Sequence, residues 1–281
     1  MSKNKLYIIL FACLSFVSCG EYQKLLKSSD PDLKYTKAIE YFERKDYMRA
    51  QSLLDEVAQY YKGTERSEDV LHYLAECYVG QKDYYSASEY YNAYCKNYPK
   101  GRYAENAYYM AAYCHYLNSD DARLDQTETY SAIDAFNLFL ERFPESEQSG
   151  EAYRLLDELN DKLAYKEVLN ARLYYNLGTY RGNNYESAII VANNALKDYP
   201  LTKHREELSF IVLESMYKQA SLSVKERQEE RYREALDEYY SFINEFPNGK
   251  YRKSADRIFK ETDKAIKTLK SLPVPVTLPQ E

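Results

Sequence analysis

The residues best suited to chemistry in this sequence are three histidines, five cysteines and one aspartate-rich stretch. His72, His115 and His204 lie far apart and lack the His-Glu-x-x-His pairing of zinc hydrolases. No cysteine is followed by another two or three residues later, so the ligand spacing of a zinc site is also missing. Asp120 and its acidic neighbours could begin a calcium loop, but the glycine and the distal glutamate of that motif are absent. We therefore expect no enzyme active site, no cofactor and no metal.

One cysteine does stand in a chemical context, at the end of a short apolar run. Two lysines precede the uncharged, mostly apolar residues 6–17, and a serine, Cys19 and a glycine follow. A membrane-spanning helix needs roughly 20 apolar residues, so this run is too short to be one. Its basic start, apolar centre and small-residue end are typical of a secretory signal. The sequence therefore predicts a signal peptide at residues 1–18.

A cysteine directly after such a site resembles the lipobox of bacterial lipoproteins. In that family the thiol is diacylated, the peptide is cut just before the cysteine, and the new amine is acylated. The resemblance implies that Cys19 is the lipid-bearing N-terminus of the mature chain and that residues 19–32 form a lipidated tether. Several acyl chains anchor a protein stably. Gly20 in place of aspartate favours the outer membrane, so we expect a lipid-anchored protein on its periplasmic face. A plain secreted protein with an incidental cysteine stays open as an alternative.

The other cysteines give no disulfide framework. Cys13 lies within the signal, and the remaining Cys77, Cys95 and Cys114 are odd in number. Two of them lie in apolar helical stretches, where cysteine usually behaves as a small buried hydrophobe. We expect all three to be reduced and structural.

The elements that would position any site repeat along the chain. Five segments carry an alanine, apolar residues four and seven positions later, and a stop twelve positions later; the clearest runs from Asp83 to Pro99. This spacing marks one face of an α-helix, which a proline cannot continue. The five alanines are Ala50, Ala87, Ala132, Ala188 and Ala235. Each segment is predicted to be the second helix of a helical hairpin.

The best-preserved unit matches a known repeat. A small residue, a tyrosine, an alanine, an aromatic residue and a proline occur at the spacing of the tetratricopeptide family, on Ala75, Tyr78, Ala87, Tyr91 and Pro99. The resemblance implies an all-α fold, a right-handed superhelical solenoid of about five hairpins with a C-terminal capping helix. Hairpins that bury their apolar faces on their neighbours need no single central core.

The domain boundaries follow from these repeats. We expect the solenoid to cover residues 33–270, with N-terminal repeats at 33–148 and C-terminal repeats at 149–270. The last residues, 271–281, hold three prolines and are predicted to be disordered.

Four irregular stretches depart from the repeat. They are predicted to be a polar tether at 21–32, an exposed loop at 118–129, a long helix at 149–179 and a charged turn at 225–231.

The composition of the chain indicates which classes of partner it could bind. The chain has 33 tyrosines, 10 phenylalanines and no tryptophan. Tyrosine rings offer bulk for packing and a polar edge for water, so they could form a peptide-binding surface or simply pack helices together. The net charge of −6 argues against nucleic acid, because neutralising phosphates requires a basic face.

The whole layout resembles the BamD family, the lipoproteins of the outer-membrane β-barrel assembly machine, particularly its forms from Bacteroidetes-like bacteria. The resemblance is carried by residues 19–28, by the hairpins, by the loop 124–129, and by residues 161–164 ahead of Tyr174 and Tyr175. It implies a non-enzymatic scaffold that helps to fold and insert β-barrel proteins. The implied partners are unfolded barrel substrates, a BamA-like barrel protein, the other lipoproteins of the machine and the membrane.

Two sets of candidate site residues follow. The concave groove of a hairpin array is lined by first helices, which here include Tyr35, Tyr73, Tyr108 and Tyr109; the resemblance implies that N-terminal repeats bind substrate. It also implies that the C-terminal repeats dock the barrel partner, through Lys162, Tyr174 and Tyr175. Arginine is common in the family at the place of Lys162, and lysine keeps the charge but loses the planar fork.

Two other functions are compatible with a tetratricopeptide lipoprotein. A scaffold for peptidoglycan or cell-envelope complexes would predict an N-terminal coiled coil, which this sequence lacks. A glycan-uptake accessory lipoprotein would be larger and rich in tryptophan, and this chain has none.

Overall fold

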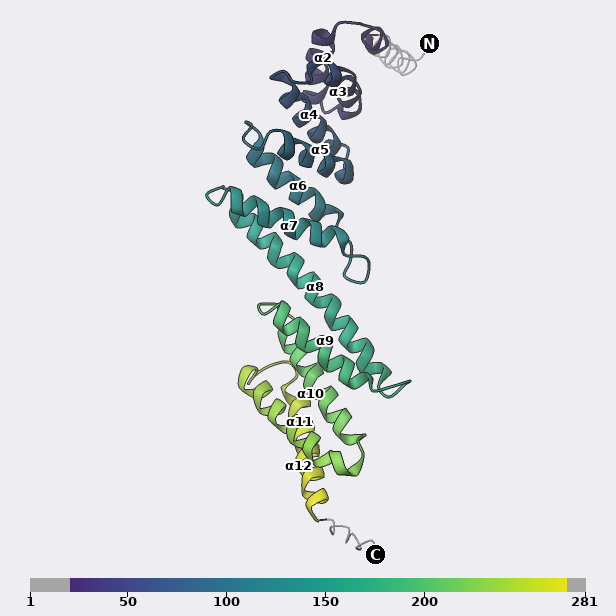
Figure 1. Cartoon of the computed structure of the whole chain (residues 1–281), viewed down its shortest axis with the longest axis vertical. Helices are drawn as coiled ribbons and strands as arrows, with labels where there is room; N and C mark the ends of the chain where they lie inside the picture. Colours follow the sequence, from purple (N-terminus) through teal and green to yellow (C-terminus); the bar gives the residue numbers. More distant parts are fainter. Residues whose placement is uncertain (1–20, 272–281) are drawn as a thin grey trace, which may run out of the picture. The chain divides into compact units, whose positions relative to one another are not determined.

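The computed structural model describes residues 21–271, and every regular element in that range is helical (Figure 1). The all-α fold is thereby confirmed. The helices are α2 (Pro31–Glu43), α3 (Tyr47–Tyr61), α4 (Arg66–Gly80), α5 (Tyr84–Asn97), α6 (Ala104–Asn118), α7 (Thr127–Arg142), α8 (Ser149–Leu177), α9 (Asn184–Asp198), α10 (Arg205–Ser221), α11 (Lys225–Glu245) and α12 (Arg252–Ser271). The long helix and the C-terminal helix predicted from the sequence correspond to α8 and α12.

The helices pair as hairpins of the tetratricopeptide type. The repeated alanine segments are α3, α5, α7, α9 and α11, each the second helix of its pair, and their alanines are buried. Within the first two pairs, Ala38 and Ala75 on the first helices are also fully buried. Small side chains on both sides allow the two helices to approach closely, which is why the alanine spacing predicted the fold.

The turns inside the first two hairpins are built alike. Lys45 and Lys82 adopt positive φ angles of 62° and 63°, and each is followed by an aspartate. Asp46 and Asp83 then cap the second helices by accepting hydrogen bonds from backbone N–H groups three residues later. A left-handed residue followed by a capping aspartate reverses the chain within very few residues.

The chain forms two compact units. Unit 1 contains α2 to α7 and the start of α8, up to Arg154; unit 2 contains residues 155 onward together with the loop residues 121–126. That loop is attached to α8 through the Lys166 ammonium, which donates to the Leu124 carbonyl at 2.7 Å. Each unit has its own buried clusters.

The exposed loop predicted at 118–129 is confirmed for residues 119–126, most of which are exposed, although α7 already begins at Thr127 and a few side chains are buried. Ala122, Gln126 and Thr129 are buried. The Gln126 side-chain amide donates to the carbonyls of Asp121, Leu124 and Asp125, so the loop folds around one buried polar side chain. The polar composition predicted the exposed residues of the loop, but not the burial of Gln126.

The predicted charged turn at 225–231 is wrong, since these residues form the first turns of α11. Arg227 pairs with Glu230 at 3.2 Å and Arg233 with Glu229 at 2.6 Å. Opposite charges three and four residues apart stabilise a helix, so the charge run extends α11 instead of interrupting it.

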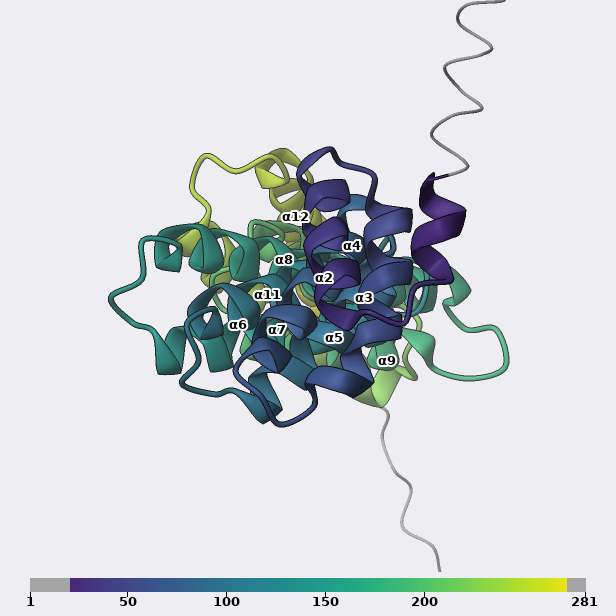
Figure 2. The same cartoon turned by 90° about the horizontal axis from the view of Figure 1, so that it is seen from above.

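The described part of the predicted tether includes a short docked helix. Residues 21–26 are helical, and Leu25 is buried in the cluster formed by α2, α3 and α4. Figure 2 shows this short helix, in purple, beside α2 and α3.

Some predictions fall outside the described residues. The signal peptide at 1–18, the lipidated Cys19 and residues 272–281 of the tail are among them. The domain boundaries derived from the repeats stay predictions.

A recurrent contact joins successive hairpins, and we call it the inter-hairpin clasp. A carboxylate in the first helix of one hairpin accepts a hydrogen bond from a backbone N–H that precedes the next hairpin or capping helix. A ring four residues after the carboxylate packs against a ring from that same segment. The three clasps are Glu68 and His72 with Arg102 and Tyr103; Asp161 and Tyr165 with Lys203 and His204; and Glu206 and Phe210 with Tyr251.

The hydrogen bonds of the three clasps have ordinary lengths. The backbone N–H groups lie 2.7 Å, 3.1 Å and 2.8 Å from the oxygens of Glu68, Asp161 and Glu206. His72 and Tyr103 stack with their ring centroids 3.8 Å apart. The clasp thus gives a hydrogen-bond acceptor to a backbone N–H in the turn that precedes the next helix.

Glycine is required where the carboxylate approaches the backbone most closely. A Cβ atom added at Gly101 would overlap the Glu68 carboxylate, and one added at Gly249 would overlap the Glu206 carboxylate. Both glycines lie two residues after the proline that ends the preceding helical segment.

Replacing Gly101 with alanine should lower the free energy of unfolding by about 1–3 kcal/mol, because the new methyl group displaces the Glu68 carboxylate from the Arg102 N–H. Chemical denaturation followed by circular dichroism measures the change. Gly150 is the matched control, since a Cβ there meets nothing within 4 Å and alanine suits a helix. Equal stability of the Gly101→Ala variant and the parent chain would contradict the clasp.

Candidate functional site

Five side chains of unit 1 form a surface that we call the tyrosine–arginine surface. It consists of Tyr35 on α2, Arg66 and Tyr73 on α4, and Arg102 and Tyr103 just before α6. Burial raises the pKa of Tyr35, and the nearby hydroxyl of Tyr73 raises it further while Arg66 and Arg102 oppose the shift. Arg66 of α4 lies over the ring of Tyr35, and His72 of α4 packs against Tyr103, so side chains from three successive hairpins converge.

The two arginines lie over aromatic rings. The Arg66 guanidinium carbon is 5.4 Å from the centroid of Tyr35 and 5.3 Å from that of Tyr61, and that of Arg102 is 4.8 Å from Tyr103. Both arginine side chains remain about half exposed, at 48% and 57%. A guanidinium spread over a ring keeps its N–H groups available at the edges.

Acidic residues at the starts of α2 and α4 fix these arginines. Asp32 accepts hydrogen bonds from Arg66 and from the Tyr61 hydroxyl, and Asp69 accepts from Arg102 and, at 3.2 Å, from the Tyr103 hydroxyl. The hydrogen bonds from Tyr61 and Arg66 lower the pKa of Asp32. The arginines are therefore held in place without a bound ligand.

This arrangement is suited to binding an extended polypeptide. The rings offer apolar area to side chains, while the guanidinium groups can donate to backbone carbonyls or carboxylates. Neither interaction demands one particular sequence, so the surface could accept many peptides.

His72 lies under this surface and is stacked on Tyr103. Its Nδ1 atom is buried, with no hydrogen-bond partner among the residues that the structure describes. Burial lowers the pKa of His72, while the carboxylates of Glu76 and Glu68 partly oppose the shift. The ring is therefore held in its neutral form.

The four tyrosines predicted to line the groove are not equivalent. Tyr35 and Tyr73 are half-buried and belong to the tyrosine–arginine surface. Tyr108 and Tyr109 are only 6% and 8% exposed. Their burial leaves little area for a ligand, and Tyr109 packs on the rings of two phenylalanines of α7.

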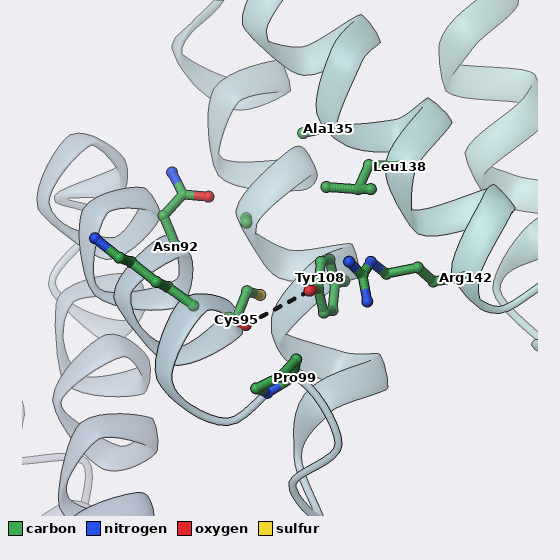
Figure 3. A pocket seen from close by; sticks show the side chains of 9 residues that line it. Asn92, Cys95, Pro99, Tyr108, Ala135, Leu138 and Arg142 are labelled. Carbon is green, nitrogen blue, oxygen red and sulfur yellow. Dashed lines mark hydrogen bonds between the residues drawn. The ribbon is translucent and has the colours of Figure 1, made fainter.

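Tyr108 forms the floor of a separate pocket of about 430 Å³ between α5, α6 and α7 (Figure 3). Its hydroxyl lies 3.5 Å from the Cys95 carbonyl, and the Arg142 guanidinium lies 4.9 Å from its ring centroid. The rest of the lining is Asn92, Lys96, Pro99, Ala111, Ala135 and Leu138. The pocket can take an apolar side chain beside two cations.

The residues predicted to dock a partner lie along α8 in unit 2. Tyr174 and Tyr175 border the cluster of α8, α9 and α10, whereas Lys162 is twelve residues earlier, about 18 Å along the helix axis. Burial, and then the neighbouring Glu214 carboxylate, raises the pKa of Tyr175. Arg172 pairs with Glu214 at 2.9 Å. Tyr174 and Tyr175 therefore lie at the same cluster, and Lys162 lies apart from them.

Sequence reasoning missed most of the tyrosine–arginine surface. Arg66, Arg102 and Tyr103 lie outside the positions used to recognise the repeat. A signal was available, since a basic residue follows the repeat-ending residue by three or four places in four of the five repeats.

Two other features, a metal site and a membrane-spanning helix, are not found in the described part of the chain. Residues 21–271 hold no group of three or more metal-ligating side chains. No helix in that range is long and apolar enough to cross a membrane. Cys77, Cys95 and Cys114 are free and buried, as expected, and burial raises the pKa of each thiol to about 12.

The family model and the similar relatives indicate the same protein family. The model of the YfiO family, described as outer membrane lipoprotein, matches residues 28–181 and 177–267. The outer membrane protein assembly factor BamD of Rickettsia prowazekii (strain Madrid E) is 24% identical over 181 residues, which are 64% of this chain and 70% of that protein. The putative factor of the same name from Aquifex aeolicus (strain VF5) is 24% identical over 273 residues, covering 92% of this chain and 89% of the relative.

Among solved structures, the alignment with the TPR2AB domain of yeast Sti1 in its Hsp90 complex covers 83% of this chain and 98% of the Sti1 chain. Its TM-score is 0.36 and its sequence identity 12%.

Replacing His72 with phenylalanine should alter the pH dependence of stability, because the ring is kept and its proton site is removed. The pKa of His72 is lowered by folding from 6.5, so the unfolded parent binds more protons than the folded one as the pH falls through that value. Relative to the variant, the parent should therefore lose stability below about pH 6.5, by at most about 1.4 kcal/mol per pH unit. Urea denaturation at several pH values measures the difference, and a constant difference would contradict a buried neutral His72.

Proposed function

Because the chain belongs to the YfiO outer membrane lipoprotein family, we propose that it is a non-enzymatic scaffold lipoprotein of the machinery that assembles β-barrel proteins in the outer membrane. The observation that carries the proposal is the family match, which covers residues 28–267. Two relatives that are named assembly factors, one aligned over 92% of this chain, support it.

The membrane attachment is proposed to be Cys19, acylated after removal of residues 1–18. The support is the lipobox-like sequence and the lipoprotein description of the family. The chain would then sit on the periplasmic face of the outer membrane, where unfolded barrel proteins arrive.

The substrate-binding part is proposed to be the tyrosine–arginine surface of unit 1. A barrel strand alternates apolar and polar side chains, and an unfolded one has free backbone carbonyls. The partly exposed rings can take the apolar side chains, and the N–H groups of Arg66 and Arg102 can donate to the carbonyls. Many weak contacts of this kind would hold an unfolded chain without trapping it.

Unit 2 is proposed to dock a BamA-like barrel protein and, with it, the other lipoproteins of the machine. Within this unit, Tyr174 and Tyr175 are half-buried, and Arg172 is held by Glu207 and Glu214. Half-exposed aromatic residues beside a positioned arginine are the residue types enriched at the centres of protein interfaces. Lys162, near the middle of α8, would contact the partner separately.

Replacing Cys19 with alanine should prevent acylation and removal of the signal by the lipoprotein route. Mass spectrometry of the purified chain should then show no acyl groups, whereas the mature parent should begin at Cys19 and carry them. Cys95→Ala is the matched control and should leave acylation intact, because Cys95 is a buried thiol of α5. Acyl groups on the Cys19→Ala chain would contradict the proposed anchor.

The Arg66→Ala/Arg102→Ala chain should bind barrel-strand peptides at least about fivefold more weakly, since truncating an interface arginine commonly costs more than 1 kcal/mol. Fluorescence anisotropy with a labelled peptide that copies a strand of an outer membrane barrel protein gives the affinity. Arg233→Ala is the control, because Arg233 is similarly exposed on α11 in unit 2. Unchanged affinity in the double variant, or an equal loss in the control, would contradict the assigned surface.

A further inference from the structure

The first described residues form an arm that is docked on the first hairpin. Leu25 is buried among residues of α2, α3 and α4. Tyr22 packs edge-on against Tyr41, with ring centroids 5.7 Å apart, and the Arg49 guanidinium lies within 6 Å of both rings. We call residues 21–28 the N-terminal arm.

Polar contacts fix the arm as well. The Lys34 ammonium of α2 donates to the Leu26 carbonyl at 3.0 Å and pairs with Glu56 of α3. The Ser28 hydroxyl then accepts from the N–H of Asp30, which caps α2. The arm is therefore joined to both helices of the first hairpin by a buried leucine, a ring pair and a charged hydrogen bond.

A hollow of about 610 Å³ lies between the arm and α2. Its lining is Glu21, Lys24, Leu25, Ser28, Leu33, Lys37, Glu40, Tyr41 and Arg44. The Glu40 carboxylate forms ion pairs with two of these basic side chains, Lys37 at 2.7 Å and Arg44 at 3.9 Å. Lys24 is exposed at this hollow, Lys27 is exposed three residues later in the arm, and Leu33 adds exposed apolar area.

The surface around the hollow therefore differs from the chain as a whole. The chain has a net charge of −6, but the lining of the hollow has three basic side chains, Lys24, Lys37 and Arg44, and two acidic ones. Cations placed around an exposed leucine fit a surface of phosphate groups above an apolar layer, which describes a phospholipid membrane.

The position of the anchor brings this surface to the membrane. Only Gly20 separates Cys19 from the arm, and two residues span at most about 7 Å. We propose that the face bearing Lys24, Lys27, Lys37 and Arg44 lies against the membrane and binds acidic phospholipid headgroups. This inference rests on the proposed acylation of Cys19. Its consequence is a first hairpin held in one orientation by its anchor instead of swinging on a loose tether.

We expect the binding of these basic side chains to acidic headgroups to be weak by itself, which is enough for a contact that supplements the lipid anchor. Each basic residue near an acidic membrane contributes about 1 kcal/mol, or about fivefold in binding. A few such residues bind weakly in free solution, but the acyl chains keep them permanently close to the headgroups. The contact would therefore depend on salt and on the acidic lipid content.

The test uses the full acylated chain reconstituted in vesicles of phosphatidylcholine, with or without phosphatidylglycerol. An amine-reactive reagent labels exposed lysines, and mass spectrometry gives the rate at each one. Lys24, Lys27 and Lys37 should react at least about fivefold more slowly in the acidic vesicles. Lys100, exposed in unit 1 between α5 and α6, should react equally in both.

A charge-reversed chain, Lys24→Glu/Arg44→Glu, should lose the protection of Lys37, while a Lys62→Glu/Lys100→Glu control should keep it. These four side chains are exposed, so folding should survive, as circular dichroism can verify. Equal labelling of Lys24, Lys27 and Lys37 in both vesicle types, or equal slowing of Lys100, would overturn this inference alone. A mature chain that carries no acyl groups would overturn the proposed anchor together with it.

Discussion

Each clasp joins one hairpin to the segment that follows it, by placing a carboxylate against a backbone N–H that precedes the next hairpin or the capping helix. A single hairpin of this chain cannot bury its apolar face alone, so stability requires that hairpins stack in a fixed register. Apolar packing alone is not directional. Glu68, Asp161 and Glu206 supply the direction, because each accepts a backbone N–H at one defined position of the neighbouring segment. The glycines beside two of these carboxylates allow that approach.

The same junction creates the surface to which we assign function. Once the clasp has brought Tyr103 onto His72, the adjacent Arg102 reaches Asp69 of the preceding hairpin and lies over the Tyr103 ring. Asp32 holds Arg66 in a comparable way one hairpin earlier. Contacts that stabilise the stack therefore also display guanidinium groups and rings in a row. A chain of net charge −6 can in this way offer localised cations to an extended peptide.

The sequence predicted the hairpins well because their signals are local. Ala87 and Tyr91 lie one helical turn apart, and a spacing of that kind survives any change elsewhere in the chain. The clasps could not be predicted in this way, since their partners are 34, 42 and 45 residues apart and the spacing changes with each insertion. The docking of Leu25 depends on tertiary contacts too, so the polar composition of residues 21–32 did not predict it. Similarly, Tyr73 and Tyr109 both lie on first helices, and only the packing of α6 on α7 shows that Tyr109 is buried.

The central claim is that this lipoprotein scaffolds the assembly of barrel proteins in the outer membrane. It is tested most directly by recovering the native chain from gently solubilised envelopes and identifying the proteins that come with it. The account predicts a BamA-like barrel protein with periplasmic docking domains as the main companion, together with unfolded barrel substrates after cross-linking. Recovery of cell-wall synthases alone, or of a single sugar-uptake system alone, would contradict it.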